Sequence, residues 1–392
     1  MTANGRIGDD GVDDPRTVVI TSPEELIASI PSMLGFPPGP GSVVVICGRT
    51  ADGHAGPVVR MDVDGLLAAP GSPPGGVDGW VGADGWAGAD GWAGADGWTG
   101  ADGWTGAEDC RSGEGEHPPV VADDGPARGL ARFCSREGVT DVHLVVVHED
   151  CADGHSAGLR AEDAAAAFEY WLGLAGTQVV GAYGVGEFAH GSPWVDLFGM
   201  VRGTQADPDS TEIAAVHAFD GRVRAGSRGE IDRLYQVRDH EACDDEPHGR
   251  GPARLEGALE VDRAVRAHED AVRRLEEGEE LDDDELAGIG RVLLDIAVRD
   301  EVYRRLAHRG LCDRDGRRLL WWSLARRRPG RERSVALLLL GAAAYFAGSG
   351  VHARSALEAA VTADPGNSLA RLLLHGLENG LAPERLRRVA AA

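Results

Sequence analysis

The most apolar part of this 392-residue chain is a run of 14 residues, from Val335 to Gly348, which contains no charged side chain. A helix needs about 20 apolar residues to cross a bilayer, so this run predicts a helix buried in protein. Gly341 lies within the run, and Ala353 and Ala360 follow it. These small residues would let two antiparallel helices pack closely, so the last third of the chain is predicted to contain a helical hairpin.

The spacing within this hairpin resembles a tetratricopeptide repeat, which has Leu-Gly in its first helix, small residues where the helices cross and a closing Pro. Leu340 and Gly341 supply the pair, Leu357 takes the large apolar position and Pro365 closes the unit. A single repeat makes no concave surface, because that surface needs stacked repeats. The hairpin therefore either packs onto its own domain or offers a docking surface to a protein partner.

The charge of the chain restricts its partners. Asp and Glu number 64 against 39 basic residues, a formal net charge of −25. Such acidity disfavours nucleic acid and anionic membranes as partners. All basic residues are Arg, and 56 residues are Gly, which is typical of a high-GC bacterial coding sequence. The sequence gives no indication of oligomeric state.

The cysteines and the N-terminus both favour the cytoplasm. Six cysteines occur at irregular spacing with no Cys-x-x-Cys pair, which suits a reducing compartment better than a disulfide framework. The first 16 residues are polar and acidic, and they carry no signal-peptide core. We expect residues 1–16 to be a disordered lead.

A low-complexity insertion divides the first half of the chain. Within residues 64–126, the hexapeptide Asp-Gly-Trp-x-Gly-Ala occurs in five near-perfect copies. Five hexapeptides make fewer than the three coils that a β-helix needs to bury a core. The insertion is therefore predicted to be disordered and to have arisen by repeat expansion. The alternative is a sticky or ligand-binding tract.

Strands and helices alternate on both sides of the insertion, which predicts an α/β or α+β sheet domain over residues 17–63 and 127–240. One helix begins at Ser22, with Pro31 and Gly35 as its stop signals, and another covers 161–175. Ser227 begins a further capping box. Strands are expected at Val43–Cys47, Val58–Val63, Val142–Val147, Val179–Val185 and Trp194–Val201.

The polar stretch 238–253 predicts the domain boundary, and residues 254–392 are predicted to be all-helical. Asp282 and Glu285 form a helix-capping signal. An apolar stripe at helical spacing follows this signal. Its members are Leu286, Ile289, Leu293, Ile296 and Tyr303.

Five segments together resemble the bacterial family called domain of unknown function 4192. They are SPEELIASIPSMLGFPPGPGSVVVI from Ser22, SRGE at 227–230, VRDEVYRR at 298–305, LLWWSLARRRPG at 319–330, and the apolar hairpin through Pro383. The resemblance implies this architecture and no mechanism. It also implies a stretch with aromatic residues and cysteine near the later strands. Residues 192–208 contain no Cys, so cysteine chemistry of relatives would not carry over.

Two motifs near the predicted strands contain residues used in ligand sites. His143, His148, Cys151 and His155 cluster at a strand end and offer zinc-type ligands. Their spacing matches no established site, so no metal is expected. His148, Cys151 and His155 remain weak candidates for metal ligands. The alternative is that they are loop residues beside a strand. Gly181, Gly184 and Gly186 follow a strand, but no helix follows them as a dinucleotide site requires. They predict a turn or bulge, and no cofactor is expected.

Asp300 falls on the predicted apolar stripe, where a lone charge would be costly. It is expected to be buried and to pair with Arg304 or an arginine of 326–328. The alternative is a polar functional site that includes Arg299.

Residues 299–334 contain 12 Arg against five acidic residues, together with Trp321 and Trp322. Arg with Trp can bind polyanions or stack on bases. The same residues can equally pack and pair within the chain. Arg299, Asp300, Trp321 and Trp322 thus form the possible polar site.

No catalytic motif is present, and no catalytic residue is assigned. The sequence favours a non-catalytic interaction or regulatory protein that docks a protein partner through its C-terminal helices. The alternative is an enzyme or sensor acting on a small polar molecule bound between the α/β and helical domains.

Overall fold

The computed structural model describes residues 2–6, 15–48, 56–63, 125–154, 158–219, 222–236, 258–308 and 315–391. They form two compact units that divide between Gly226 and Ser227. The hexapeptide repeats and the predicted linker at 238–253 lie outside the described residues. Among the described residues, no helix has the length and apolarity to cross a membrane.

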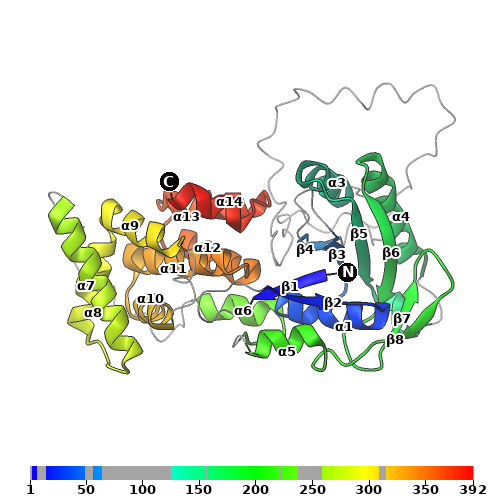
Figure 1. Ribbon diagram of the computed structural model, residues 1–392, viewed down its shortest axis with the longest axis horizontal. Helices are drawn as coiled ribbons and strands as arrows, with labels where there is room; N and C mark the ends of the chain where they lie inside the picture. Colours follow the sequence, from blue (N-terminus) through cyan, green and yellow to red (C-terminus); the bar gives the residue numbers. More distant parts are fainter. Residues whose placement is uncertain are drawn as a thin grey trace, which may run out of the picture. The chain divides into compact units, whose positions relative to one another are not determined.

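The first unit is built on a six-stranded mixed sheet with strand order β4-β3-β5-β6-β7-β8 (Figure 1). β5 and β6 are parallel and joined by helix α4 (Gly158–Leu174), whereas the other neighbours are antiparallel. The strands are β3 (Ser42–Cys47), β4 (Val58–Asp62), β5 (Asp141–Val147), β6 (Gln178–Val185), β7 (Pro193–Asp196) and β8 (Arg202–Thr204). The predicted sheet domain is confirmed.

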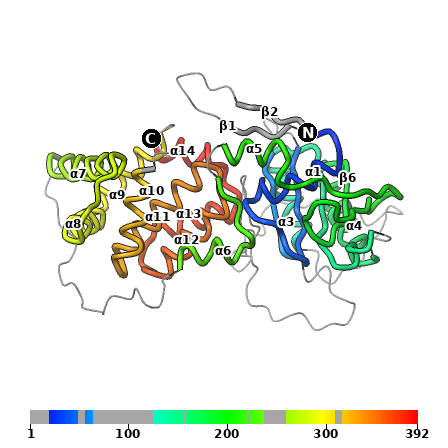
Figure 2. Tube along the Cα trace, turned by 90° about the horizontal axis from the view of Figure 1, so that it is seen from below, coloured from blue at the N-terminus to red at the C-terminus, as the bar shows by residue number. Residues whose placement is uncertain are grey.

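Helices cover both faces of this sheet. Val43, Val45 and Cys47 of β3 pack in one apolar cluster with α3 (Gly125–Glu137) and α4. Helix α1 (Pro23–Leu34) lies on the opposite side in both views (Figures 1 and 2). Because both faces are buried, β3 needs the continuous apolar run seen in its sequence.

Helix α1 begins as predicted, because Ser22 Oγ accepts a hydrogen bond from the Glu25 amide. Pro31 does not stop it. The helix continues to Leu34 and ends at Gly35, whose φ of 84° suits glycine. Helix α5 (Glu212–Phe219) packs on α1.

The predicted lead at residues 1–16 is partly described as a strand. β1 (Thr2–Arg6) pairs antiparallel with β2 (Pro15–Val19). That residues 1–16 form a disordered lead stays a prediction.

The predicted strand Trp194–Val201 is wrong in its second half. β7 ends at Asp196, whose carboxylate accepts a hydrogen bond from the amide of Phe198 at 3.0 Å. The chain turns there and returns as β8. Asp196 therefore converts one apparent strand into a hairpin, through a local side-chain turn that strand periodicity does not show.

The second unit is helical, as predicted. After α6 (Arg228–Tyr235) come α7 (Ala258–Glu276), α8 (Asp283–Leu293), α9 (Ile296–Leu306), α10 (Asp315–Arg327), α11 (Gly330–Phe346), α12 (Gly350–Ala363), α13 (Ser368–Glu378) and α14 (Pro383–Ala391). Helix α6 belongs to this unit and packs on α12, so the division lies upstream of the predicted boundary.

Helix α11 is the centre of the helical unit, since nearly all its residues are buried. It packs along α12, and a Cβ on Gly341 would lie 2.8 Å from Leu357 Cγ. The two helices thus form the predicted hairpin with its close approach. Its tetratricopeptide character stays a prediction, and α13 and α14 follow the hairpin.

The predicted single stripe from Leu286 to Tyr303 is wrong, because two helices share it. α8 ends at Leu293, and Asp295 caps α9 by accepting hydrogen bonds from the amides of Ala297 and Val298. The break resets the helical phase. Val298 and Val302 are buried in α9, whereas Ile296 is 64% exposed.

Candidate functional site

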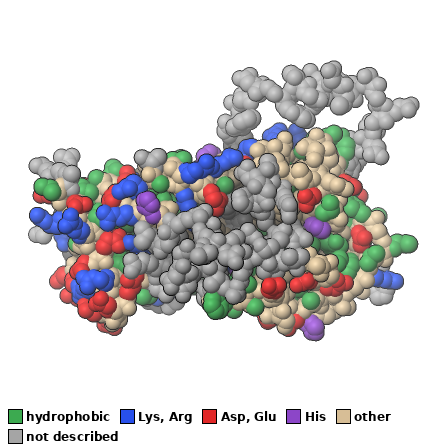
Figure 3. Space-filling model, in the orientation of Figure 1, with side chains coloured by type: hydrophobic (Ala, Val, Ile, Leu, Met, Phe, Trp, Pro, Cys, Tyr) green, Lys and Arg blue, Asp and Glu red, His purple; other side chains and the backbone are tan. Residues whose placement is uncertain are grey.

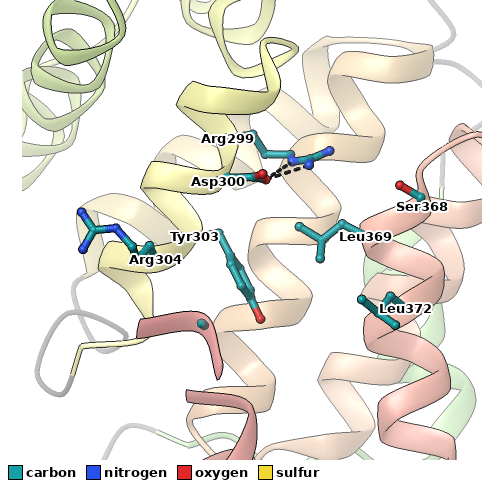
Figure 4. Close-up of a pocket in the computed structure, with 8 residues that line it drawn as sticks. Arg299, Asp300, Tyr303, Arg304, Ser368, Leu369 and Leu372 are labelled. Carbon is teal, nitrogen blue, oxygen red and sulfur yellow. Dashed lines mark hydrogen bonds and ion pairs between the residues drawn. The ribbon is translucent and has the colours of Figure 1, made fainter. Parts of the chain in front are cut away.

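A groove of about 610 Å³ lies on the helical unit between α9, α13 and α14 (Figure 4). It contains two of the predicted site residues. Its lining comprises Arg299, Asp300, Tyr303 and Arg304 from α9, Ser368, Leu369 and Leu372 from α13, and Ala390 from α14.

An ion pair forms the polar wall of this groove. Nε and Nη2 of Arg299 donate to Oδ1 of Asp300 at 2.9 and 2.7 Å. The Arg299 side chain extends toward Ser368, whereas that of Arg304 points away from α13 (Figure 4) and pairs with Glu301. The Asp300 side chain is 52% exposed. The prediction that it is buried and paired with Arg304 or residues 326–328 is therefore wrong, because the break before α9 turned it outward.

The floor of the groove is aromatic. Tyr303 is buried, and its ring lies 5.7 Å from that of Phe346 in α11. Burial raises the pKa of the Tyr303 phenol well above its usual value, and Asp300 adds to the rise. Arg387 of α14 lies over the Phe346 ring and donates a hydrogen bond to the backbone oxygen of Phe346. Packing thus fixes the floor, and the phenol stays protonated.

The opposite wall is apolar and open to water. Leu369 and Leu372 point from α13 into the space facing Tyr303 (Figure 4). Leu372 is 64% exposed, so it offers an apolar contact to a ligand beside the buried Tyr303. The lining contains no histidine or cysteine, and its one carboxylate is already paired with Arg299. This combination suits binding of an apolar group beside an anion better than acid–base chemistry.

The charge around the groove is opposite to that of the whole chain. The three helices that form it carry seven Arg and four acidic residues, whereas the whole chain has a net charge of −25. Figure 3 shows basic side chains gathered over the region of α14. Long-range attraction therefore favours an acidic ligand.

The two predicted tryptophans lie outside the groove, in separate packing clusters. Trp321 is fully buried and donates Nε1–H to Nε2 of His268 at 3.1 Å. Trp322 stacks on Tyr235 at 5.1 Å between centroids, and the Arg326 guanidinium lies 5.7 Å from its ring. The four residues of the predicted polar site are thus not brought together. Within the described part of residues 299–334, arginines pack on aromatic rings, as Arg326 does, or pair with acidic side chains, as Arg328 does with Glu332.

The weak metal candidates are used in packing and capping. Cys151 is buried against Gly184, and burial is the main cause that raises its thiol pKa to about 12. Nδ1 of His148 accepts a hydrogen bond from the Asp150 amide at 3.1 Å. His155 lies outside the described residues. No group of three or more His, Cys, Asp or Glu in the described ranges is arranged to hold a metal ion.

The glycine motif predicted a turn or bulge, and the sheet has an irregularity at the first of its glycines, Gly181. The register of β5 and β6 shifts between Val142 and His143. At each motif glycine a Cβ would be too close to a neighbour, 2.9 Å from Nδ1 of His143 at Gly181 and 2.7 Å from the Cys151 sulfur at Gly184. The glycines therefore permit close packing.

The α13 wall is absent from the predicted site residues. A signal for it does exist in Arg371-Leu372-Leu373-Leu374, because three consecutive leucines on a helix cannot all face one core. Leu373 is buried and Leu372 is the one exposed in the groove. The pairing of α13 with α9 carries no comparable signal.

Comparison with known families gives a match over residues 118–384 to a domain of unknown function (DUF4192). The chain belongs to this family. The DUF4192 match runs from before α3 into α14, so it includes parts of both units and all of the groove lining except Ala390. The resembling segment that begins at Ser22 lies outside it. Searches of curated proteins and of solved structures gave no significant match.

Proposed function

We propose that this DUF4192 protein is a non-catalytic interaction protein that binds a segment of a protein partner in the groove of α9, α13 and α14. The observation that carries the proposal is the exposed Leu372 facing Tyr303 across from the Arg299–Asp300 pair. Binding would remove the leucine from water, a favourable change that scales with the buried area. An acidic group on the partner would contact Arg299 in the polar wall of the groove.

We further propose that the binding takes place in the cytoplasm. Cys47, Cys134 and Cys151 are buried cysteines. A side-chain hydrogen bond with Cys134, together with burial, raises the pKa of the Cys47 thiol well above its usual value. Buried thiols with a raised pKa stay protonated and unreactive, which suits a reducing compartment.

Site-specific photocrosslinking in the source cell tests the proposed function. A photoreactive amino acid at position 372 should give an adduct with one partner protein. The same amino acid at Leu259, which is 84% exposed on α7, should not give that adduct. An identical adduct pattern at both positions would contradict the proposal. A copurified small polar molecule without any protein adduct at position 372 would instead favour the enzyme or sensor.

A further inference from the structure

We propose that the hexapeptide-repeat segment of this chain, residues 77–106, is itself a ligand of the α9–α13–α14 groove. The segment lies outside the described residues, so the proposal rests on the groove's geometry and the segment's sequence. It also rests on the proposed function, because it names one polypeptide that occupies the same site.

The repeat segment carries the two groups that the groove is suited to bind. Each copy places an Asp two residues before a Trp, and no Arg, Lys or His occurs from residue 61 to 110. The segment is therefore both acidic and aromatic. In an extended chain, side chains two residues apart lie on the same side, about 7 Å from each other. One Asp-Gly-Trp unit would thus present its anion and its indole together.

The groove offers matching partners for both groups. Leu369 and Leu372 with the Tyr303 ring provide apolar contacts for an indole. Arg299 uses Nε and Nη2 for Asp300, and its guanidinium has a further nitrogen to offer a second carboxylate. The volume of about 610 Å³ is within the usual range of ligand sites.

Repetition of the unit would turn a weak contact into effective occupancy. Five copies present the same Asp and Trp at steps of six residues. When one copy leaves, another is held nearby at a high effective concentration. The repeats would then compete with a partner protein for the groove, so their number would set how strongly the site is inhibited.

A labelled peptide of residues 83–100, which spans three repeats, tests this inference by fluorescence anisotropy. The receptor is the full chain with Trp80, Trp86, Trp92, Trp98 and Trp104 replaced by Ala, so that its own repeats do not compete. We expect saturable binding, and weaker binding to the unmodified chain. Replacing the peptide's tryptophans by Ala should abolish binding.

Matched receptor variants locate the binding site. Leu372→Asp should weaken binding about tenfold, and Arg299→Gln about fivefold. Two controls should bind as the parent does. They are Leu259→Asp and Arg266→Gln, both of which change exposed side chains on α7 outside the groove.

No binding, or equal binding to the parent and Leu372→Asp, overturns the inference. A partner adduct at position 372 without peptide binding would leave the proposed function standing alone. Peptide binding without an adduct at position 372 would support this inference and contradict the proposed protein partner. The oligomeric state distinguishes the two sources of the segment, since repeats bound in a second copy give oligomers that the five Trp→Ala changes dissociate.

Discussion

The hydroxyl of Tyr235 lies 3.0 Å from Nδ1 of His352, although 117 residues separate them in the sequence. Tyr235 is the last residue of α6, and its ring also stacks on Trp322 of α10. Burial lowers the pKa of His352 to about 4, so the imidazole is neutral and can accept the phenol's hydrogen bond. These contacts attach α6 to the helical unit.

Tyr235→Phe should lower the free energy of unfolding by about 1–3 kcal/mol, because the half-buried His352 Nδ1 loses its partner while the Tyr235 ring still packs. Urea denaturation followed by circular dichroism measures the change. Tyr170→Phe is the control, since Tyr170 is only half-buried on α4, and it should change stability by less than about 0.5 kcal/mol. Equal effects of the two substitutions would contradict this account of α6.

The same histidine predicts a pH dependence. The folded-state pKa of about 4 lies below the ordinary value of 6.5, mainly through burial and also through Arg318 and Arg228. The unfolded chain therefore takes up the proton first, so the stabilisation is present above pH 6.5 and is lost as the pH falls toward 4. The stability difference between the native chain and His352→Gln should shift against the native chain by about 2 kcal/mol from pH 7.5 to pH 5. A constant difference across this range would show that His352 titrates normally.

Gly341 tests the close approach of α11 and α12. Its added Cβ would lie 2.8 Å from Leu357 Cγ and 3.2 Å from the backbone oxygen of Ala353. Gly341→Ala should destabilise the chain by about 1–3 kcal/mol, because overpacking outweighs the gain in helix propensity. Gly288→Ala on α8 has nothing within 4 Å and should stabilise by about 0.5–1 kcal/mol. Thermal unfolding of both variants checks the opposite signs, and stabilisation by Gly341→Ala would contradict the packing.

The break between α8 and α9 predicts different roles for two nearby aspartates. Asp295→Ala removes the cap of α9 and should cost about 1 kcal/mol. Asp300→Ala removes only a half-exposed pair with Arg299 and should cost less than about 0.5 kcal/mol. Chemical denaturation of the two variants separates these outcomes. A loss of several kcal/mol at Asp300 would instead support the buried ion pair expected from the sequence.

The sheet could be predicted well because its signals are local. β3 and β5 are continuous apolar runs, and a buried strand needs such a run regardless of its neighbours. Asp196 and Asp295 are two of the places where prediction failed. Each is a single polar residue whose side chain reorganises the backbone nearby, so the apolar period on either side does not show the turn or the break.

The groove could be predicted only in part. Arg299 and Asp300 were identified because charges on an apparent apolar stripe are conspicuous, yet the stripe itself spanned two helices. Leu372 lies 72 residues later in the chain than Asp300, and nothing in either segment shows that α13 faces α9. Trp321 and Trp322 were grouped with the site because they are close to it in the sequence. Adjacent residues on a helix point about 100° apart, so Trp321 contacts His268 whereas Trp322 contacts Tyr235.

Strand β4 is one of the two edge strands of the sheet, and the low-complexity insertion follows it in the sequence. Growth of the insertion at that point leaves the pairing of β4 with β3 unchanged. The free-energy cost of closing a loop, which is entropic, rises by only about 0.6 kcal/mol for each doubling of the loop's length. Relatives whose insertions differ twofold in length should therefore differ in folding stability by less than about 1 kcal/mol. Repeat number can thus change with little effect on the stability of the fold.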